Sequence, residues 1–344
     1  MNRPSRIFGQ AFAKPVLTAV YRALNKVFPR SRIITLVGAA MITSLGYSSG
    51  FANELSYQLE PIEVAPSCYA LVGSEDYFSG DNGGYIVNTG FIVTDAGVVV
   101  IDTGPSFRFG EKLRQVITET SNNAPILASF ITHSHPDHYL GNQAFTDAPI
   151  YGGSDTINTI EQMGEDFTVN MYRLVGDWMR GTESIAPNTK LTESQTFRFG
   201  NRDISLIRFE GHTAEDFAIF DETCATLYAG DLVFNARTLS TPHANIDEWI
   251  TTLQAIKAIP FKVLVPGHGA ISDSHTPIEE TIDYLTWLKK RLLDSYQSGL
   301  DITEVMELPI PKRFRNFSLA RDEYRRSVHN LYPAIEATYL PLIN

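Results

Sequence analysis

A short polar cluster at residues 132–138 (THSHPDH) constrains this chain more than any other feature of its sequence. It follows an apolar run, residues 125–131, which predicts a buried strand that leads out into a loop. His133 and His135 can project to one side of that strand end, because alternate residues share a face. An aspartate and a third histidine follow in the turn, where they could face a second ion. Imidazole and carboxylate ligands suit zinc, with iron or manganese as alternatives, so the cluster predicts a metal site.

Three further polar residues stand at the ends of predicted strands, and each follows a glycine: His212, Asp231 and His268. A glycine lets the backbone turn sharply, so that the next side chain can point toward a shared site. One such residue alone would usually be an ordinary turn residue. Together with the 132–138 cluster, the ordered set predicts that all of them serve one metal centre.

These motifs resemble the metallo-β-lactamase-fold superfamily, over about residues 60–295. The resemblance implies an α/β fold, an αββα sandwich in which two mixed β-sheets pack together with helices on both outer faces. It also implies two zinc ions, with iron or manganese as alternatives. The ligands of the first ion would be His133, His135 and His212, and those of the second would be Asp137, His138 and His268. Asp231 would bridge the two ions.

The order of the expected elements agrees with this fold. Strand-like runs precede a helix over residues 107–119, for which Ser106 is the expected cap, and a strand follows at 126–132. In the second half, strand-like runs between residues 195 and 228 precede helices over 246–259 and 277–296. Both halves thus place strands before helices, as expected for two sheets with helices outside. We expect this domain to span residues 53–300, with two further helical segments in an extension, 301–344, packed on it.

Two of the ligands narrow the resemblance. At the place of His135, flavodiiron proteins carry a glutamate, so the chain differs from them there. At the place of Asp231, class B β-lactamases have no bridging aspartate, so the chain differs from those enzymes as well. The ligand set is therefore most similar to the glyoxalase II, lactonase and related hydrolase branches. Further motifs resemble the exported zinc hydrolases of the quinoprotein relay system, at residues 88–91, 102–106, 135–138, 141–145, 177–182 and 241–244. That resemblance implies a periplasmic quinoprotein or cytochrome partner, associated with PQQ-dependent alcohol dehydrogenases.

The first 52 residues carry seven basic side chains and no acidic one, and residues 33–47 form an uncharged apolar run. This pattern resembles a secretory signal peptide with a long basic region, which predicts cleavage after Ala52 and a periplasmic protein without stable membrane insertion. An uncleaved membrane anchor is the alternative, since residues 33–52 are about long enough to span a bilayer. The rest of the chain has 21 Lys and Arg against 39 Asp and Glu, which disfavours nucleic acid as a partner.

The two cysteines, Cys68 and Cys224, would meet an oxidising compartment after export. One disulfide is compatible with the sequence, although spacing alone does not establish that the two Cα atoms come within bonding reach. Cys224 lies in a strand-like run, and we therefore expect it to serve as a small buried residue.

We expect a metal-dependent hydrolase, in which a hydroxide that bridges the two ions attacks an ester, thioester, lactone or related bond of a small molecule. The catalytic residues would be Asp137, which orients the hydroxide or accepts its proton, and Asp231, which holds the spacing of the ions. Neighbours that could accept the free N–H of metal-bound rings are Asp102, Thr132 and Thr213. The expected substrate contacts are His243, Arg237, Trp178 and Tyr172, the last two from a long segment over residues 164–187.

Two other classes of protein remain open. A mononuclear iron enzyme that resembles the persulfide dioxygenases would use only His133, His135, His212 and Asp231. A metal-bearing accessory protein of quinoprotein assembly would keep the metal as structure. The mononuclear iron enzyme would leave three ligands without a role. The accessory protein is disfavoured because structural zinc sites tend to be closed and single. The complete second group of ligands therefore favours the dinuclear hydrolase.

Overall fold

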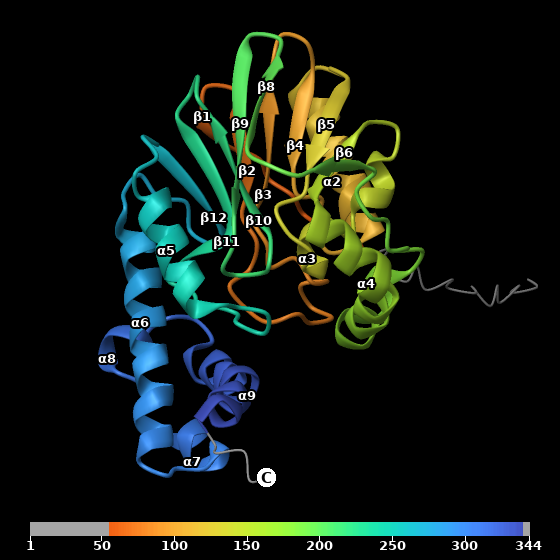
Figure 1. Cartoon of the computed structure of the whole chain (residues 1–344). Helices are drawn as coiled ribbons and strands as arrows, with labels where there is room; N and C mark the ends of the chain where they lie inside the picture. The colour runs from red at the N-terminus through yellow and green to blue at the C-terminus, as the bar shows by residue number, and fades with distance from the viewer. Residues whose placement is uncertain (1–54, 340–344) are drawn as a thin grey trace, which may run out of the picture. The chain divides into compact units, whose positions relative to one another are not determined.

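The computed structural model describes residues 55–339, which belong to one compact unit, Asn53–Asn344. The predicted leader, residues 1–52, lies outside the described residues. Within the described part, no helix is both long and apolar enough to cross a bilayer. The unit is built from two β-sheets that face each other, with helices on their outer sides (Figure 1).

The first sheet has seven strands that lie side by side in chain order. They are β1 (Ile62–Ala65), β2 (Cys68–Leu71), β3 (Thr89–Val93), β4 (Val98–Ile101), β5 (Ile126–Phe130), β6 (Ile150–Gly153) and β7 (Thr189–Leu191). Strands β1 to β4 pair antiparallel, and β4 to β7 pair parallel.

The second sheet has five strands in the order β12-β11-β10-β9-β8. They are β8 (Gln195–Phe199), β9 (Arg202–Phe209), β10 (Asp216–Asp221), β11 (Thr226–Asn235) and β12 (Val263–Gly269). All neighbours pair antiparallel except β11 and β12, which pair parallel. Both sheets are therefore mixed, and the predicted α/β sandwich is confirmed.

Strand β4 is buried on both faces, and side-chain alternation decides which layer each of its residues joins. Val98 and Val100 pack with the helices outside the first sheet. Val99 and Ile101 point the other way, into the core between the two sheets. A continuous apolar run of this kind fits a strand that is covered on both sides.

Helices α2 and α4 cover the first sheet, and α5 and α6 cover the second (Figure 1). The α-helices are α2 (Phe107–Thr120), α3 (Pro136–Tyr139), α4 (Ser154–Val175), α5 (Ile246–Ile256), α6 (Thr276–Gln297), α7 (Ile302–Glu307), α8 (Lys312–Arg315) and α9 (Ala320–Tyr339). Two 3-10 turns are η2 (Asn142–Phe145) and η3 (Gly176–Met179). The hydroxyl of Ser106 caps α2 by accepting the N–H of Phe109, as predicted from the sequence.

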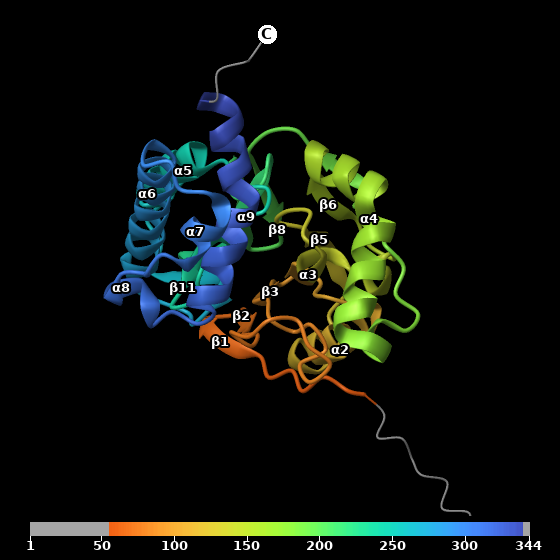
Figure 2. The ribbon, with the colours of Figure 1, turned by 90° about the horizontal axis from the view of Figure 1, so that it is seen from below.

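The C-terminal extension differs from the two segments expected. It forms three helices in the described residues, because the segment 308–311 with its two prolines separates α7 from α8. Val305, Phe314 and Tyr324 bury their side chains in the same core cluster as α6. Helix α9 thereby reaches back toward the end of the sandwich where α3 lies (Figure 2).

The long segment predicted over residues 164–187 begins as a helix. Helix α4 continues to Val175, because Met171 and Val175 are buried on the same side as Ile160 and extend its packing on the first sheet. The first half of this segment is therefore helix that packs on the first sheet.

A disulfide joins Cys68 on β2 to Cys224, whose Cα atom lies 7.4 Å away. Cys224 lies in the turn between β10 and β11, where it is half buried, so the expectation of a small buried strand residue was wrong. The strand-like composition around Cys224 belongs to the two strands on either side of that turn. The bond therefore links the first sheet to the second.

Candidate metal centre

The seven predicted ligands come from segments at the same end of both sheets. His133 and His135 follow β5, and Pro136 then starts α3, which carries the next two ligands. His212 lies between β9 and β10, whereas Asp231 and His268 are part of β11 and β12. Figure 2 views the chain from this end, with α3 between α9 and α4.

The sequence predicted that β11 ends before Asp231. In the structure the strand instead continues to Asn235. Gly230 adopts a left-handed conformation (φ +51°), and the pairing of β11 with β12 shifts register there. This irregularity lets the strand continue while Asp231 turns toward the site. Gly267 on β12 is needed for space, since a Cβ there would lie 2.1 Å from Oδ1 of Asp231.

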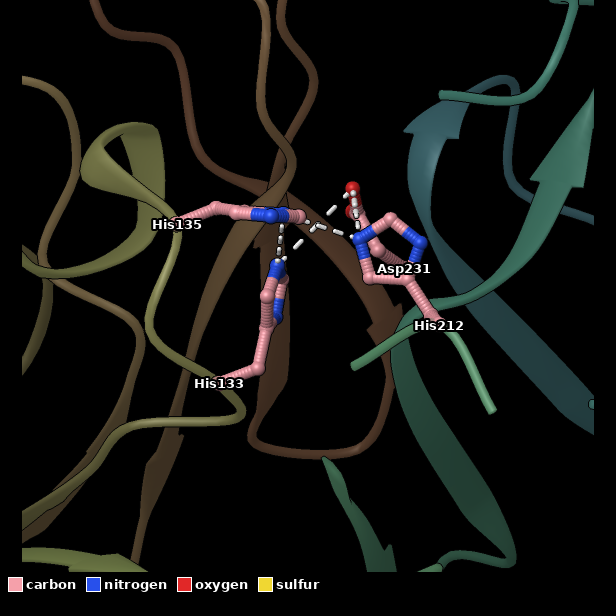
Figure 3. Close-up of side chains that lie close together, drawn as sticks. All are labelled: His133, His135, His212 and Asp231. Carbon is pink, nitrogen blue, oxygen red and sulfur yellow. Dashed lines mark hydrogen bonds and ion pairs between the residues drawn. The ribbon is translucent and has the colours of Figure 1, made fainter. Parts of the chain in front are cut away.

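Four donor atoms converge in the first ligand group (Figure 3). Nδ1 of His135 lies 3.0 Å from Nε2 of His133 and 2.9 Å from Nε2 of His212. Oδ2 of Asp231 lies 3.3 Å from Nε2 of His212 and 3.9 Å from Nε2 of His133. All four side chains are buried.

The second ligand group uses the other oxygen of Asp231. Oδ1 of Asp231 lies 3.1 Å from Nε2 of His138 and 3.2 Å from Nε2 of His268. Oδ2 of Asp137 completes the group, 3.4 Å from Nε2 of His268 and 3.8 Å from Nε2 of His138. Asp231 therefore offers one oxygen to each group, which is the arrangement of a bridging ligand.

The donor set fits two metal ions. Ligands at 2.0–2.2 Å from a tetrahedral ion lie about 3.4 Å from one another, which agrees with the separations in both groups. In the described structure, Nε2 of His138 and Oδ1 of Asp231 are buried without a hydrogen bond. Buried polar atoms seldom lack a partner, and a cation held by the second group would provide one for both atoms.

The protonation states of four ligands also favour metal binding. Burial lowers the pKa values of His133, His135 and His212 well below the ordinary range, so these rings are neutral and keep a lone pair for a metal. Burial acts against the charge of Asp231, but the neighbouring His268 and His138 hold the pKa of its carboxyl well below its usual range. Asp231 is therefore ionised at neutral pH. At His138, burial lowers the pKa but Asp231 and Asp102 raise it above the ordinary range, so an ion would displace a proton there.

Asp102 and Thr132 orient two of the ligand rings. The carboxylate of Asp102 accepts hydrogen bonds from Nδ1 of His138 (2.7 Å), the N–H of Thr132 (2.8 Å) and the hydroxyl of Thr132 (2.9 Å). The same hydroxyl lies 3.0 Å from Nδ1 of His133. These contacts place the proton of each ring on Nδ1 and leave Nε2 free to bind metal.

Two ligand neighbours were not predicted from the sequence. The carbonyl of Ile86 accepts a 2.7 Å hydrogen bond from Nδ1 of His268. Asp216 holds Thr213 through hydrogen bonds to its N–H and hydroxyl, both 2.9 Å, and burial raises the pKa of Asp216 to about 8. Thr213 thus supports the loop after His212, and none of its described hydrogen bonds reaches a ligand ring. No local motif marks Ile86, because its contact with His268 joins two segments that are 182 residues apart. The contact of Asp216 with Thr213 is local, three residues along the chain.

A family model described as the metallo-β-lactamase superfamily matches residues 82–268, which is more than half of the chain and includes all seven ligands. The chain belongs to the metallo-β-lactamase superfamily. The predicted class of enzyme, a metal-dependent hydrolase, is confirmed at the level of this family. The family match ends at His268, so it does not extend to α6 or to any later helix.

The relatives of this superfamily member are distant. A "Beta-lactamase-like protein 2 homolog" of Caenorhabditis elegans is 25% identical over 206 residues, which are 59% of this chain and 62% of the relative. The chain thus spans less than two thirds of that relative. The "Acyl-coenzyme A thioesterase MBLAC2" of Homo sapiens is 23% identical over 194 residues, 49% of this chain and 68% of the relative. A solved metallo-β-lactamase from Pontibacter korlensis shares the fold, with a TM-score of 0.55, 22% identity, and coverage of 67% of this chain and 99% of that one.

A cavity of about 150 Å³ lies beside the ligand groups of this metallo-β-lactamase fold. Four ligands line it: His135, Asp137, Asp231 and His268. Other lining residues come from the loop before β3 (Tyr77, Phe78), from α4 (Phe167, Asn170), from the segment after β11 (Arg237, His243) and from α9 (Glu323, Arg326). The cavity is therefore open to substrate next to both groups.

The structure places two of the four predicted substrate residues on this cavity. Arg237 and His243 line it, and Nδ1 of His243 lies 2.8 Å from Nε2 of His135. Trp178 instead packs on Tyr57 in the core, with its indole N–H donated to a backbone carbonyl.

Tyr172 is half exposed and donates its hydroxyl to Asp177, away from the cavity. The residues of α4 that do reach the cavity are Phe167 and Asn170, because they lie on another side of the helix from Tyr172.

Proposed function

We propose that this chain is a dinuclear zinc hydrolase that cleaves an ester, a thioester, a lactone or a related bond of a small molecule. The position of Asp231 carries the proposal, because its two oxygens face two separate groups of three further ligands. Two zinc ions held there would supply an activated water as the nucleophile and would polarise the bond under attack. One structural ion would need only one of the groups.

The residues of the chain have distinct roles in this proposal. Asp231 sets the spacing between the two groups. Asp137 lines the cavity, so its carboxylate can orient the attacking water and accept its proton. Asp102 keeps the ring of His138 turned with Nε2 toward the second group.

A carbonyl ester or thioester is the bond that the surroundings favour. Ile86, Phe78 and Phe167 line the cavity and offer apolar surface for an acyl group. The human relative is named as an acyl-coenzyme A thioesterase, which is a precedent for such a bond in this superfamily. The acidic surplus of the chain disfavours polyanionic substrates such as nucleic acids.

The mononuclear iron alternative would give no role to Asp137, His138 and His268. These three residues are buried together, with their donor atoms grouped as closely as those of the first group. A purely structural role for the metal would not call for a cavity lined by the ligands. Both alternatives therefore explain less of the site than the dinuclear hydrolase.

We also propose that the protein is exported to the periplasm and acts beside a quinoprotein or cytochrome. The leader pattern and the motifs shared with the quinoprotein relay hydrolases support this setting. The disulfide also supports it, because such bonds persist in oxidising compartments. Sequencing the N-terminus of the exported protein should find a start near Asn53; a start at Met1 would contradict the cleaved leader.

The proposal is tested by measuring metal content with inductively coupled plasma mass spectrometry on the wild type, on His268→Ala and on His329→Ala. His329 is an exposed histidine outside the site and serves as the matched control. The same proteins are assayed against thioester, ester, lactone, β-lactam and phosphodiester substrates.

We expect two zinc ions per chain in the wild type and the control, and about one in His268→Ala, with hydrolysis lost. One iron per chain, unchanged by His268→Ala, would overturn the dinuclear hydrolase and favour the dioxygenase class.

A further inference from the structure

Helix α9 contributes two charged residues to the cavity, Glu323 and Arg326. They are three residues apart and therefore lie on the same side of the helix. They meet Arg237, which follows β11 and lines the same cavity. The family match ends at His268, so the part of this wall that α9 supplies lies outside the matched residues.

The three charges are only loosely paired. Oε1 of Glu323 lies 3.5 Å from Nη1 of Arg326 and 3.9 Å from Nη2 of Arg237. Glu323 is fully buried, and its carboxylate oxygens have no close hydrogen bond in the described structure; the hydroxyl of Tyr77, on the same cavity, is an uncharged polar neighbour. The hydrogen bonds of Arg237 to backbone carbonyls are also long, at 3.3 and 3.4 Å. Buried charges with so few close contacts are costly, unless a further polar group completes the cluster.

The charge balance decides which kind of group fits. Two arginines face one glutamate, so the cluster carries one net positive charge on a chain that is acidic overall. The only ion pair of Arg326 among the described residues is its 3.5 Å contact with Glu323, and its side chain is 43% exposed. Its guanidinium therefore keeps free N–H donors. A guanidinium fork of this kind matches the two oxygens of a carboxylate.

The neighbouring Arg325 shows the contrast on the same helix. It is similarly exposed, but its guanidinium is held by Glu307 at 2.5 Å, and it does not line the cavity. The loosely paired guanidinium at the cavity is thus a property of position 326 rather than of the helix as a whole.

We propose that Arg326, with Arg237 and Glu323 around it, binds a carboxylate on the acyl part of the substrate, so that the preferred substrates are half-esters or half-thioesters of short dicarboxylic acids. The cavity is small, at about 150 Å³, which favours a short acyl chain over a long one. This inference rests on the proposed hydrolase function, which places the scissile bond at the metal ligands in the same cavity.

The binding test uses zinc-loaded protein and two probes of equal length, glutarate and pentanoate, measured by isothermal titration calorimetry. A charge-assisted pair should make glutarate bind roughly tenfold more tightly than pentanoate to the wild type. In the matched control, Arg325→Gln, we expect the same ratio of glutarate to pentanoate affinity, whereas Arg326→Gln should bring this ratio near one. Both variants should keep two zinc ions and an unchanged melting temperature. Equal binding of the two probes to the wild type would overturn the inference.

A kinetic test separates the inference from the proposed function. The 4-nitrophenyl half-ester of glutarate should be cleaved with roughly tenfold higher kcat/KM than the pentanoate ester, and Arg326→Gln should remove only this difference. If neither ester is cleaved but glutarate still binds through Arg326, the proposed hydrolase function fails, whereas the carboxylate-binding site at Arg326 stands. If 4-aminobutyrate binds more tightly than glutarate and Glu323→Gln abolishes this, Glu323 recognises a cation and the inference is wrong.

Discussion

The clearest test of the site's design is Asp102→Asn. Asp102 lies in the left-handed region (φ +55°), where asparagine is tolerated about as well as aspartate, so the change adds no backbone strain. The amide oxygen can still accept the N–H of Thr132. Its NH₂ group, however, would face Nδ1 of His138. In the wild type that nitrogen donates its proton to the carboxylate of Asp102.

His138 would then have to move its proton to Nε2, the atom that faces the second ligand group. A hydrogen bond to a charged group contributes about 1.5–3 kcal/mol, and partners of metal-bound rings are worth about 10- to 100-fold in metal affinity. We therefore expect the second zinc ion to bind roughly 10- to 100-fold more weakly. The first ion should be nearly unaffected, because Asp102 reaches His133 only through Thr132.

The assay counts zinc per chain by mass spectrometry in chelator buffers that set the free zinc concentration over several decades. Asp95→Asn, which changes an exposed aspartate in the turn between β3 and β4, is the control. Occupancy of the variant should fall from two to one at a free zinc concentration that still fills the control. If the two ions weaken equally, or if neither weakens, the assignment of Asp102 to the second ion is refuted.

Two further perturbations follow from the packing around the site. Gly267→Ala places a Cβ 2.1 Å from Oδ1 of Asp231, so we expect the zinc content of this variant to fall below one ion per chain. Gly80→Ala is the control, because a Cβ there meets nothing within 4 Å. Two zinc ions bound to Gly267→Ala would contradict the crowding argument. The disulfide closes a long loop (sequence separation 156), so its reduction should lower the free energy of unfolding by about 2–4 kcal/mol. Thermal melts with and without reductant would measure this, with Cys68→Ala, which cannot form the bond, as the control. A wild-type melting temperature that reductant leaves unchanged would contradict the expectation.

Much of the fold followed from local patterns. The continuous apolar run of β4, the cap at Ser106 and the amphipathic spacing of α6 each depend on neighbours in the chain, and these elements lie where the sequence predicts them. The extent of α4 and β11 was predicted less well. Both elements continue because of distant contacts, α4 through its packing on the first sheet and β11 through the register shift at Gly230.

The sequence by itself determined which residues could bind metal, because chelating side chains at strand ends form a recognisable pattern even when the segments are far apart. Only the tertiary structure decided that Asp231 turns one oxygen to each group, and that Cys224 meets Cys68. It also decided that Glu323 and Arg326 reach the cavity instead of Trp178 and Tyr172. The physical reason is that a ligand motif is local chemistry, whereas the walls of a cavity depend on how α4 and α9 pack, which no short stretch of sequence encodes.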